Sequence, residues 1–339
     1  ILTLEKFIES SSIIDREVSF ELLMLYLKEE KLDYAIPLIE KLISIDPSDD
    51  DFIFRVALLC FDNERYNLAE KYFNILLSKF YVPDNINFFL GQIDYKNKRY
   101  DEALLHYQRI QQGTFVNVKT LNVSKALLKK YNLEKALSHI DKEIKIKNQD
   151  NLLNSLSLKL SIFEEIGEAA DIIRLSSQIL ESFPNNERAL YSRALAYEKE
   201  GNILSMSKDF DEMIKLNKYN SIALNAYGYS LALHKLHLDK SEKLIRKALD
   251  IRPGQAAILD SLAWVLYLKG SYKEAAKYSS LAYSKDQDPE IIEHHYLILL
   301  KNGNSNEAKS ILDQSIKNNP NSEKLLKLLD SSENAAIKL

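Results

Sequence analysis

The stretch NFFLGQIDYKNKRYDEALLHYQRI, Asn87–Ile110, places small and aromatic residues at fixed offsets. Gly91 is followed nine residues later by Tyr100, and Ala103 and Tyr107 come three and seven residues after that. Apolar residues lie at three- and four-residue steps on both sides of the polar turn KNKR, which predicts two helices joined by a short turn. We expect Gly91 and Ala103 to mark where the two helices approach closely, with the tyrosines filling the space beside them.

The same offsets recur with a period near 34 residues. The aligned segments LAEKYF, EALLHY, KALSHI and EAAKYS share an alanine slot, and two further alanines lie one period outside them. The slot holds Ala35, Ala69, Ala103, Ala136, Ala275 and Ala308, and in the copies between them Ile172, Met206 and Ser241. Prolines predict where the second helix of a copy stops, at Pro47, Pro184, Pro253 and Pro320. A period of this length indicates stacked helical hairpins.

This pattern resembles the tetratricopeptide repeat family, whose signature is W-x2-L-G-x2-Y, then A-x3-F, then P. The best copies read Leu90-Gly91…Tyr100…Ala103…Tyr107 and Ala263…Tyr267…Gly270…Tyr272…Ala275. The resemblance implies an all-α fold, a right-handed superhelical α-solenoid of about nine helix-turn-helix repeats with a C-terminal capping helix.

The period divides the chain into expected repeats. They are 16–49, 50–83, 84–116, 117–152, 153–186, 187–220, 221–255, 256–288 and 289–322. Residues 1–15 are expected to be the remnant second helix of a preceding repeat, and 323–339 a capping helix and tail. The repeat at 153–186 lacks the alanine, and Pro37 falls inside an expected second helix.

Composition excludes several classes of protein. Hydrophobic residues make up 46% and charged residues 28%, a globular balance, and the net charge of −4 gives no basic excess for nucleic acid. The apolar runs are far shorter than the roughly 20 residues that cross a bilayer. The chain lacks an initiator Met and starts ILTLEKFIES, an amphipathic segment. We therefore expect a longer precursor, and membrane attachment only through an N-terminal anchor outside this chain.

The residues that could carry catalysis lack the further groups that a catalytic or metal site needs. Cys60 occupies an inward helical position, which favours a buried core thiol. The pairs His234/His237 and His294/His295 lack the further ligands of a metal site, so we expect surface or groove histidines. The chain has no glycine-rich phosphate loop, G-x-S-x-G or H-E-x-x-H motif. We expect no enzyme, catalytic residue, metal, cofactor or small-molecule substrate.

What remains is a surface for protein or peptide partners. In such solenoids the first helix of each hairpin lines the concave face, and the second, fifth, sixth, ninth, twelfth and thirteenth places of a repeat are expected to point there. Aromatic residues with a few polar partners on these places are typical of a protein-binding groove. The expected groove residues are Phe54, Phe61, Phe88, Phe89, Gln92, Tyr95, Asn122, Lys125, Tyr191, Asn225, Tyr229, Asp260, Trp264 and Tyr267. The alternative is that several of them pack between hairpins.

Two details refine this groove. Trp264, the only tryptophan, is expected to form an apolar platform with Tyr267 and Tyr229, while Asp260 receives a donor from the partner. One subclass of the family clamps acidic peptide C-termini with Lys and Asn at fixed places, but here phenylalanines occupy those places, which argues against that role.

A narrower resemblance covers Leu224–His295. The segments Asn225-Ala226-Tyr227-Gly228-Tyr229 and Ile258-Leu259-Asp260-Ser261-Leu262-Ala263-Trp264-Val265 are similar to N-A-L-G-Y and I-x-D-S-L-G-W-V of a Gram-negative group, with Tyr227 and Ala263 as departures. Some members of that group are outer-membrane lipoproteins that act as adaptors of a periplasmic carboxy-terminal processing protease. The resemblance implies a protease and its substrates as partners, in the periplasm.

Two functions remain open from the sequence. One is a non-enzymatic adaptor or scaffold that captures proteins in its groove, anchored at the outer membrane or, alternatively, cytoplasmic. The other is an envelope assembly scaffold, for pilus or lipopolysaccharide biogenesis.

Overall fold

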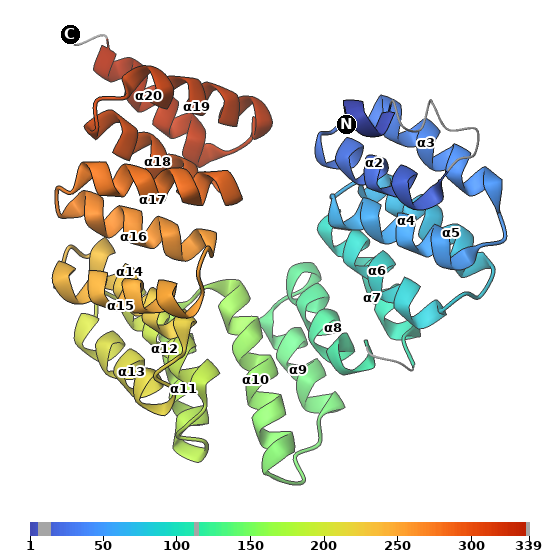
Figure 1. Cartoon of the computed structure of the whole chain (residues 1–339). Helices are drawn as coiled ribbons and strands as arrows, with labels where there is room; N and C mark the ends of the chain where they lie inside the picture. The colour runs from blue at the N-terminus through green and yellow to red at the C-terminus, as the bar shows by residue number, and fades with distance from the viewer. Residues whose placement is uncertain (6–14, 112–114, 337–339) are drawn as a thin grey trace. The chain divides into compact units, whose positions relative to one another are not determined.

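The computed structural model describes residues 1–5, 15–111 and 115–336, and within these residues every regular element is a helix (Figure 1). The chain divides into two compact units, a first unit Ile1–Ile166 and a second unit Gly167–Leu339. The helices of the first unit are α2 (Arg16–Lys28), α3 (Leu32–Ile45), α4 (Asp50–Asp62), α5 (Tyr66–Ser78), α6 (Pro83–Lys96), α7 (Tyr100–Arg109), α8 (Val116–Lys130), α9 (Leu133–Glu143) and α10 (Gln149–Ile166).

The second unit continues the same alternation of first and second helices. Its helices are α11 (Ala169–Ser182), α12 (Glu187–Lys199), α13 (Ile203–Leu216), α14 (Ser221–Leu233), α15 (Leu238–Ile251), α16 (Ala256–Leu268), α17 (Tyr272–Lys285), α18 (Pro289–Lys301), α19 (Ser305–Asn318) and α20 (Glu323–Ala336). Each unit is a stack of hairpins in which a helix contacts its partner and its neighbours. The contacts are therefore local in sequence, as in repeat proteins.

The small residues of the repeat lie where paired helices touch, as the sequence predicts. The six slot alanines are all fully buried, and so are Met206 and Ser241. At Gly91 on α6, an added Cβ would lie 2.5 Å from the ring of Tyr107 on α7. At Gly228 on α14, it would lie 2.5 Å from Ile245 on α15. The lack of a side chain thus sets how closely the helices of these two hairpins approach.

Most hairpin turns contain a residue in the left-handed backbone region; the α8–α9 turn has none, and the α14–α15 turn has two, Lys235 and His237. Glycine fills this place at Gly201, Gly270 and Gly303, with φ between 71° and 88°. Elsewhere an ordinary side chain adopts it, as at Glu64 (φ 59°) and Lys98 (φ 61°). The αL residue lets the following amides bond back to the last helical turn, which satisfies carbonyls that the helix end leaves open.

Helix boundaries follow the sequence signals closely in the second unit. Each of the four repeat-ending prolines lies two residues beyond the last residue of a helix, those of α3, α11, α15 and α19. Helices α12, α14, α16, α18 and α20 begin at the first residues of expected repeats or of the expected cap. In contrast, α10 begins at Gln149, so the boundary expected between 152 and 153 falls inside it. Pro37 does lie inside α3. Most of the expected remnant helix at 1–15 lies outside the described residues, and the division into nine repeats stays a prediction.

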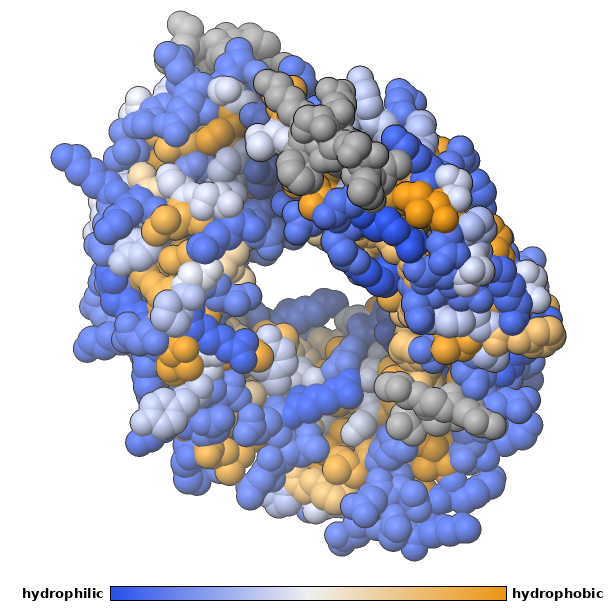
Figure 2. Space-filling view, turned by 45° about the vertical axis from the view of Figure 1, so that its right-hand side comes forward, coloured by the Kyte–Doolittle hydropathy of each residue, from blue (hydrophilic) through white to orange (hydrophobic). Residues whose placement is uncertain are grey.

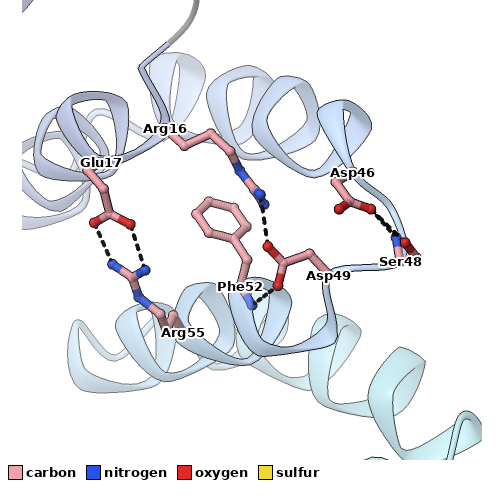
Figure 3. A network of polar contacts seen from close by, with 7 residues as sticks. All are labelled: Arg16, Glu17, Asp46, Ser48, Asp49, Phe52 and Arg55. Carbon is pink, nitrogen blue, oxygen red and sulfur yellow. Dashed lines mark hydrogen bonds and ion pairs between the residues drawn. The ribbon is translucent and has the colours of Figure 1, made fainter.

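Neighbouring first helices are also tied by charged side chains, as α2 and α4 show (Figure 3). Arg16 on α2 pairs with Asp49, the N-cap residue of α4, at 2.8 Å, and its guanidinium lies 3.9 Å from the centre of the Phe52 ring. Glu17 accepts two hydrogen bonds of 2.9 Å from Arg55. The Glu17–Arg55 pair is largely exposed, so solvent screens it and we expect it to contribute little to stability.

The surface is mostly hydrophilic, and hydrophobic side chains reach it in small separate patches (Figure 2). In the described part of the chain, no helix combines the length and the hydropathy needed to cross a membrane.

Candidate functional site

The second unit contains a pocket of about 480 Å³ on its first helices. Helices α12, α14 and α16 supply most of the lining, and the connection between α15 and α16 supplies the rest. The lining residues are Tyr191, Leu195, Glu198, Ser221, Ile222, Asn225, Ala226, Tyr229, Ser230, Leu233, Arg252, Gln255, Ala257 and Ile258. Three of the expected groove residues, Tyr191, Asn225 and Tyr229, are therefore brought together here. Each of the three is half-buried.

The helices that form the pocket run in the same direction. At their starts, Asn220 donates from Nδ2 to Glu187 Oε2 at 2.8 Å. At their ends, the Ser230 hydroxyl donates to Glu198 Oε2 at 3.1 Å. Asn220 also caps α14, because its side-chain oxygen accepts from the amide of Ala223 at 3.0 Å. These contacts fix the inner face of α14 beside that of α12.

The floor of the pocket is apolar and partly open to solvent. Ile222 and Leu233 on α14 are 55% and 46% exposed, and Leu195 and Ala226 are half-buried beside them. Large apolar side chains with this exposure recover hydrophobic free energy when a partner covers them, about 25 cal/mol per Å².

The polar groups of the pocket differ in whether they have hydrogen-bond or ion-pair partners. The side-chain oxygen of Asn225 is buried and has no hydrogen-bond donor within the described residues, a state that costs about 1–3 kcal/mol. Glu198 is engaged by Ser230 and lies 3.5 Å from the imidazole of His234. Arg252 is exposed, and no ion pair of its guanidinium is found among the described residues. Burial and the nearby Glu198 raise the pKa of Tyr191, which therefore stays a neutral hydroxyl.

The expected platform around Trp264 is assembled through a histidine. The indole stacks on the His294 ring with centroids 4.1 Å apart and on the Tyr267 ring at 5.0 Å. The Tyr229 ring lies 6.2 Å from that of His294, and its hydroxyl donates to Glu290 on α18 at 2.6 Å. The imidazole of α18 thus connects rings that come from α14 and α16. Trp264 and Tyr267 are half-buried, so packing between hairpins accounts for part of their surface.

Asp260, His294 and His295 are buried, whereas the sequence predicts them in the groove or on the surface. Asp260 is only 5% exposed, and its Oδ2 lies 2.8 Å from Nδ1 of His294, a residue that is itself 4% exposed. Burial raises the pKa of Asp260. The expectation that this carboxylate receives a donor from a partner is therefore corrected, as is the expectation that His294 and His295 are surface or groove residues. His295 is buried and shares a hydrogen bond with Ser279.

In the first unit, the expected groove phenylalanines pack on one another. The ring of Phe89 lies 5.2 Å from Phe61, 5.3 Å from Phe88 and 6.2 Å from Phe54. It also stacks on Phe73 of the second helix α5 at 5.3 Å. All four predicted residues are half-buried, and their edges face one another across α4 and α6. These contacts correspond to the packing alternative.

The remaining predicted residues of the first unit lie on α6 and α8. Gln92 and Asn122 are half-buried. The Tyr95 hydroxyl donates to Glu165 on α10 at 3.3 Å, and the Lys125 ammonium lies 3.5 Å from the same carboxylate. Tyr95 and Lys125 thus meet at one acidic residue of a third first helix.

Groups that resemble catalytic parts are buried. Cys60 is fully buried, as predicted, and burial raises the pKa of its thiol to about 12. Ser279 and His295 have the 2.8 Å contact of a nucleophile and base, but they are 0% and 2% exposed, so no substrate reaches them. Residues 1–5, 15–111 and 115–336 include no cluster of three or more His, Cys, Asp or Glu side chains that could hold a metal ion. His234 and His237 are exposed.

Comparison with known proteins agrees with the hairpin architecture. Residues 54–114 match the family profile described as Tetratricopeptide repeat. The solved structure of PilW, described as a widely conserved type IV pilus biogenesis factor, superimposes with a TM-score of 0.52, covering 64% of this chain and 100% of that one at 16% identity. The fold is an all-α tetratricopeptide-repeat solenoid.

Two curated proteins share sequence with this solenoid. The TPR repeat-containing protein PA4667 of Pseudomonas aeruginosa is 26% identical over 62% of this chain and 36% of its own length. The TPR repeat-containing protein MJ1428 of Methanocaldococcus jannaschii is 27% identical over 74% of this chain and 54% of its own length. The chain thus spans between a third and just over half of these relatives. Tetratricopeptide repeats mediate protein–protein interaction, so protein partners are the expected ligands.

Proposed function

We propose that the chain is a non-enzymatic adaptor or scaffold that captures a segment of another protein in the pocket on α12, α14 and α16. The observation that carries this proposal is the convergence of Tyr191, Asn225 and Tyr229 on one open, mostly apolar pocket. Rigid aromatic rings beside exposed aliphatic side chains bury large apolar area at small entropic cost. A pocket shared by three hairpins also sums several weak contacts into one binding site.

The partner we propose is a periplasmic carboxy-terminal processing protease or a substrate that the chain delivers to it, with the chain held at the outer membrane by an anchor N-terminal to it. Two observations support this choice. The resemblance to adaptor lipoproteins covers Leu224–His295, which includes nine of the fourteen pocket residues, and PA4667 of Pseudomonas aeruginosa is 26% identical over 62% of this chain. An envelope assembly scaffold, the alternative raised by the sequence, would use the same face.

The test compares two matched surface substitutions. Ile222→Asp places a charge on the pocket floor, whereas Leu204→Asp changes a side chain that is 70% exposed on α13, outside the pocket. We expect Ile222→Asp to weaken binding of the purified protease or its substrate about 10- to 100-fold, since the lost burial amounts to about 1.5–3 kcal/mol. Leu204→Asp should bind like the wild type. Equal binding by both variants, with equal melting temperatures, would place the partner on another face.

A further inference from the structure

We propose that the segment captured by this pocket is an extended, internal stretch of a polypeptide in which an acidic side chain accompanies an apolar one, with the acidic side chain bound at Arg252. The proposal rests on the proposed function and adds to it the chemistry of the ligand. Three features of the pocket carry it: its charge, its unsatisfied amide and its length.

The free charge of the pocket is positive and lies at one end. Among the fourteen lining residues, Glu198 and Arg252 carry the ionisable charges. Glu198 belongs to the end of α12 and is engaged by Ser230 and His234. Arg252 is the C-cap residue of α15, at the start of the connection that leads into α16, and no ion pair engages it within the described residues. A carboxylate bound at that end would therefore meet an unshared cation.

The backbone at the same end adds to this positive potential. The first turn of helix α16 lines the same pocket as Arg252, and its N-cap residue Gln255 makes no side-chain capping bond. The first amides of a helix lack intrahelical acceptors and carry the positive end of the helix dipole. Ala257, in this first turn, is exposed and lines the pocket. The guanidinium and the helix start thus favour an anionic group at one place.

The amide of Asn225 supplies a contact that does not depend on the ligand's charge. It lies on α14 between the two ends of the pocket, and its oxygen has no donor. Rotation about the Cβ–Cγ bond is soft, so the side chain can present either its donor or its acceptor to the pocket. A peptide backbone offers both complementary groups at every residue, which makes an extended chain the ligand that fits.

The length of the pocket sets the size of that chain. The lining runs along α14 from Ser221 to Leu233, about 18 Å at 1.5 Å per residue. An extended peptide covers this span with about five or six residues. Because Arg252 is exposed, a bound chain has room to continue past it, and the proposal therefore places the carboxylate on a side chain of an internal segment.

The experiment uses the full chain and fluorescent peptides of about eight residues with both termini blocked. Each peptide carries one leucine and, beside it, glutamate, glutamine or lysine; a further series has a free C-terminal carboxylate and no acidic side chain. Anisotropy measures affinity for the wild type, Arg252→Glu, Asn225→Ala and Ile222→Asp. The control is Lys247→Glu, the same type of charge change on an exposed lysine of α15 outside the pocket.

We expect the glutamate series to bind roughly fivefold more tightly than the lysine series, a difference that shrinks with added salt. Arg252→Glu should reverse the order, and Lys247→Glu should keep it. Asn225→Ala should weaken all series alike, by roughly three- to tenfold.

Other outcomes overturn the inference in distinguishable ways. If all series bind equally and Ile222→Asp abolishes their binding, the pocket captures peptides without reading charge, and the proposed function stands while this inference fails. Tight binding of the free-carboxylate series alone would also overturn it. If no series binds, this inference fails, and the proposed function is then decided by whether Ile222→Asp loses the protease or its substrate.

Discussion

Gly228 shows at the scale of one residue how the hairpins depend on atomic volume. A Cβ at this place would lie 2.5 Å from Ile245 Cγ1 and 2.9 Å from the backbone oxygen of Ser241. A side chain can move aside, but a backbone carbonyl in a packed helix moves only with that helix.

We therefore predict that Gly228→Ala destabilises the second unit. Alanine gains about 0.5–1 kcal/mol as a better helix former, and overpacking costs about 1–3 kcal/mol, so the net loss lies between about 0 and 2.5 kcal/mol. The backbone contact at Ser241 favours the upper half of that range. Urea unfolding measures it. Gly91→Ala is the comparison, since the three atoms nearest its new methyl are ring atoms of Tyr107 and none is a backbone atom; we expect it to lose less. A Gly228→Ala midpoint equal to that of the wild type would contradict the close approach.

Cys60 provides a second prediction at this scale. Its thiol is fully buried with a pKa of about 12, so at pH 8 we expect no reaction with a disulfide reagent until the chain unfolds. Labelling followed with increasing urea should coincide with loss of helicity in the first unit. Rapid labelling of the native protein would show that the α4–α5 hairpin opens on its own.

The same burial makes stability depend on alkaline pH. The folded thiol has a pKa of about 12 against an ordinary value of 9.0, so the unfolded chain loses its proton first. This contribution is fully present below about pH 9 and is lost as pH rises towards 12. We expect the urea midpoint of the first unit to fall over this window, and Cys60→Ala to flatten part of the fall. An unchanged pH profile in Cys60→Ala would assign the effect to other groups, such as Tyr72, whose pKa burial also raises to about 12.

Single positions were predictable where the repeat itself fixes them. The alanine slots and Cys60 are buried because helical period and repeat offset both point them inward. Asp260 and His294 could not be placed in this way. Asp260 Oδ2 is paired with the imidazole of His294 across 34 residues, while Asp260 Oδ1 is buried without a hydrogen-bond partner among the described residues. The imidazole offsets part of the cost of burying the carboxylate. A position that the repeat pattern places in the groove can therefore be buried in the core when the next repeat supplies a hydrogen-bonding side chain.

At the scale of the element, the turns between paired helices affect stability through the backbone conformation of a single residue. Gly201 has φ +71°, and a Cβ there would meet nothing within 4 Å. A substitution at this position therefore tests the backbone alone, without any packing term.

We predict that Gly201→Ala destabilises the chain by about 1 kcal/mol, because alanine is strained in the left-handed region. Lys98 holds the same conformation at the α6–α7 turn, so Lys98→Gly should stabilise, by up to about 1 kcal/mol. Lys96→Gly is the matched control, since it removes a charge from the last helical residue and relieves no strain. If Lys98→Gly behaves like Lys96→Gly, the turn is not the source of the effect.

Helix ends follow chemistry that is readable from sequence when a cap or a proline is present. Asn186 and Asn220 accept hydrogen bonds from the third amide of α12 and α14, and those starts fall where the period places them. The start of α10 has the same kind of cap, because Asn148 accepts from its third amide at 2.8 Å. It nevertheless lies ahead of the expected boundary at 153, and the connection after α9 carries neither proline nor glycine to mark the break. Periodicity alone leaves such a boundary open by several residues.

At the scale of the whole molecule, the two units can be followed by different spectroscopic signals. Trp264 is the only tryptophan and lies in the second unit, whereas helicity is spread over both. In a repeat array each hairpin is stabilised by its neighbours, so cooperativity need not extend along the chain.

We predict that in urea the fluorescence transition of Trp264 and the far-ultraviolet circular dichroism transition do not coincide. Gly228→Ala should shift the fluorescence transition fully and the helicity transition only in part. Coincident transitions that shift together in this variant would show that the 339 residues unfold as one cooperative unit.

The lining of the pocket was predictable as a set of positions in the repeat more than as a set of residues, and the binding role of those residues stays a prediction. The place rule for first helices points to Ile222, Ala226 and Leu233, which line the pocket, but selecting aromatic side chains passed over them. Arg252 and Gln255 belong to a connection between hairpins that no helical period covers. Their place in the pocket depends on the path of the connection between α15 and α16, which the helical pattern of the sequence does not predict.

The pocket is lined by three successive hairpins, so a ligand can make all of its contacts only while the three hairpins are folded and stacked. If the hairpin that begins with α16 detaches, the lining from Arg252 to Ile258 is lost while α12 and α14 remain folded. A ligand that requires all three then opposes detachment by RT ln(1 + [L]/Kd), about 2.7 kcal/mol at a hundredfold excess over Kd. Amide hydrogens of α16 and α17 would exchange about a hundredfold more slowly in the complex, although the ligand covers few of them. A bound segment would in this way stabilise the C-terminal hairpins against local unfolding. The rate of that local unfolding would in turn set how long the segment stays bound.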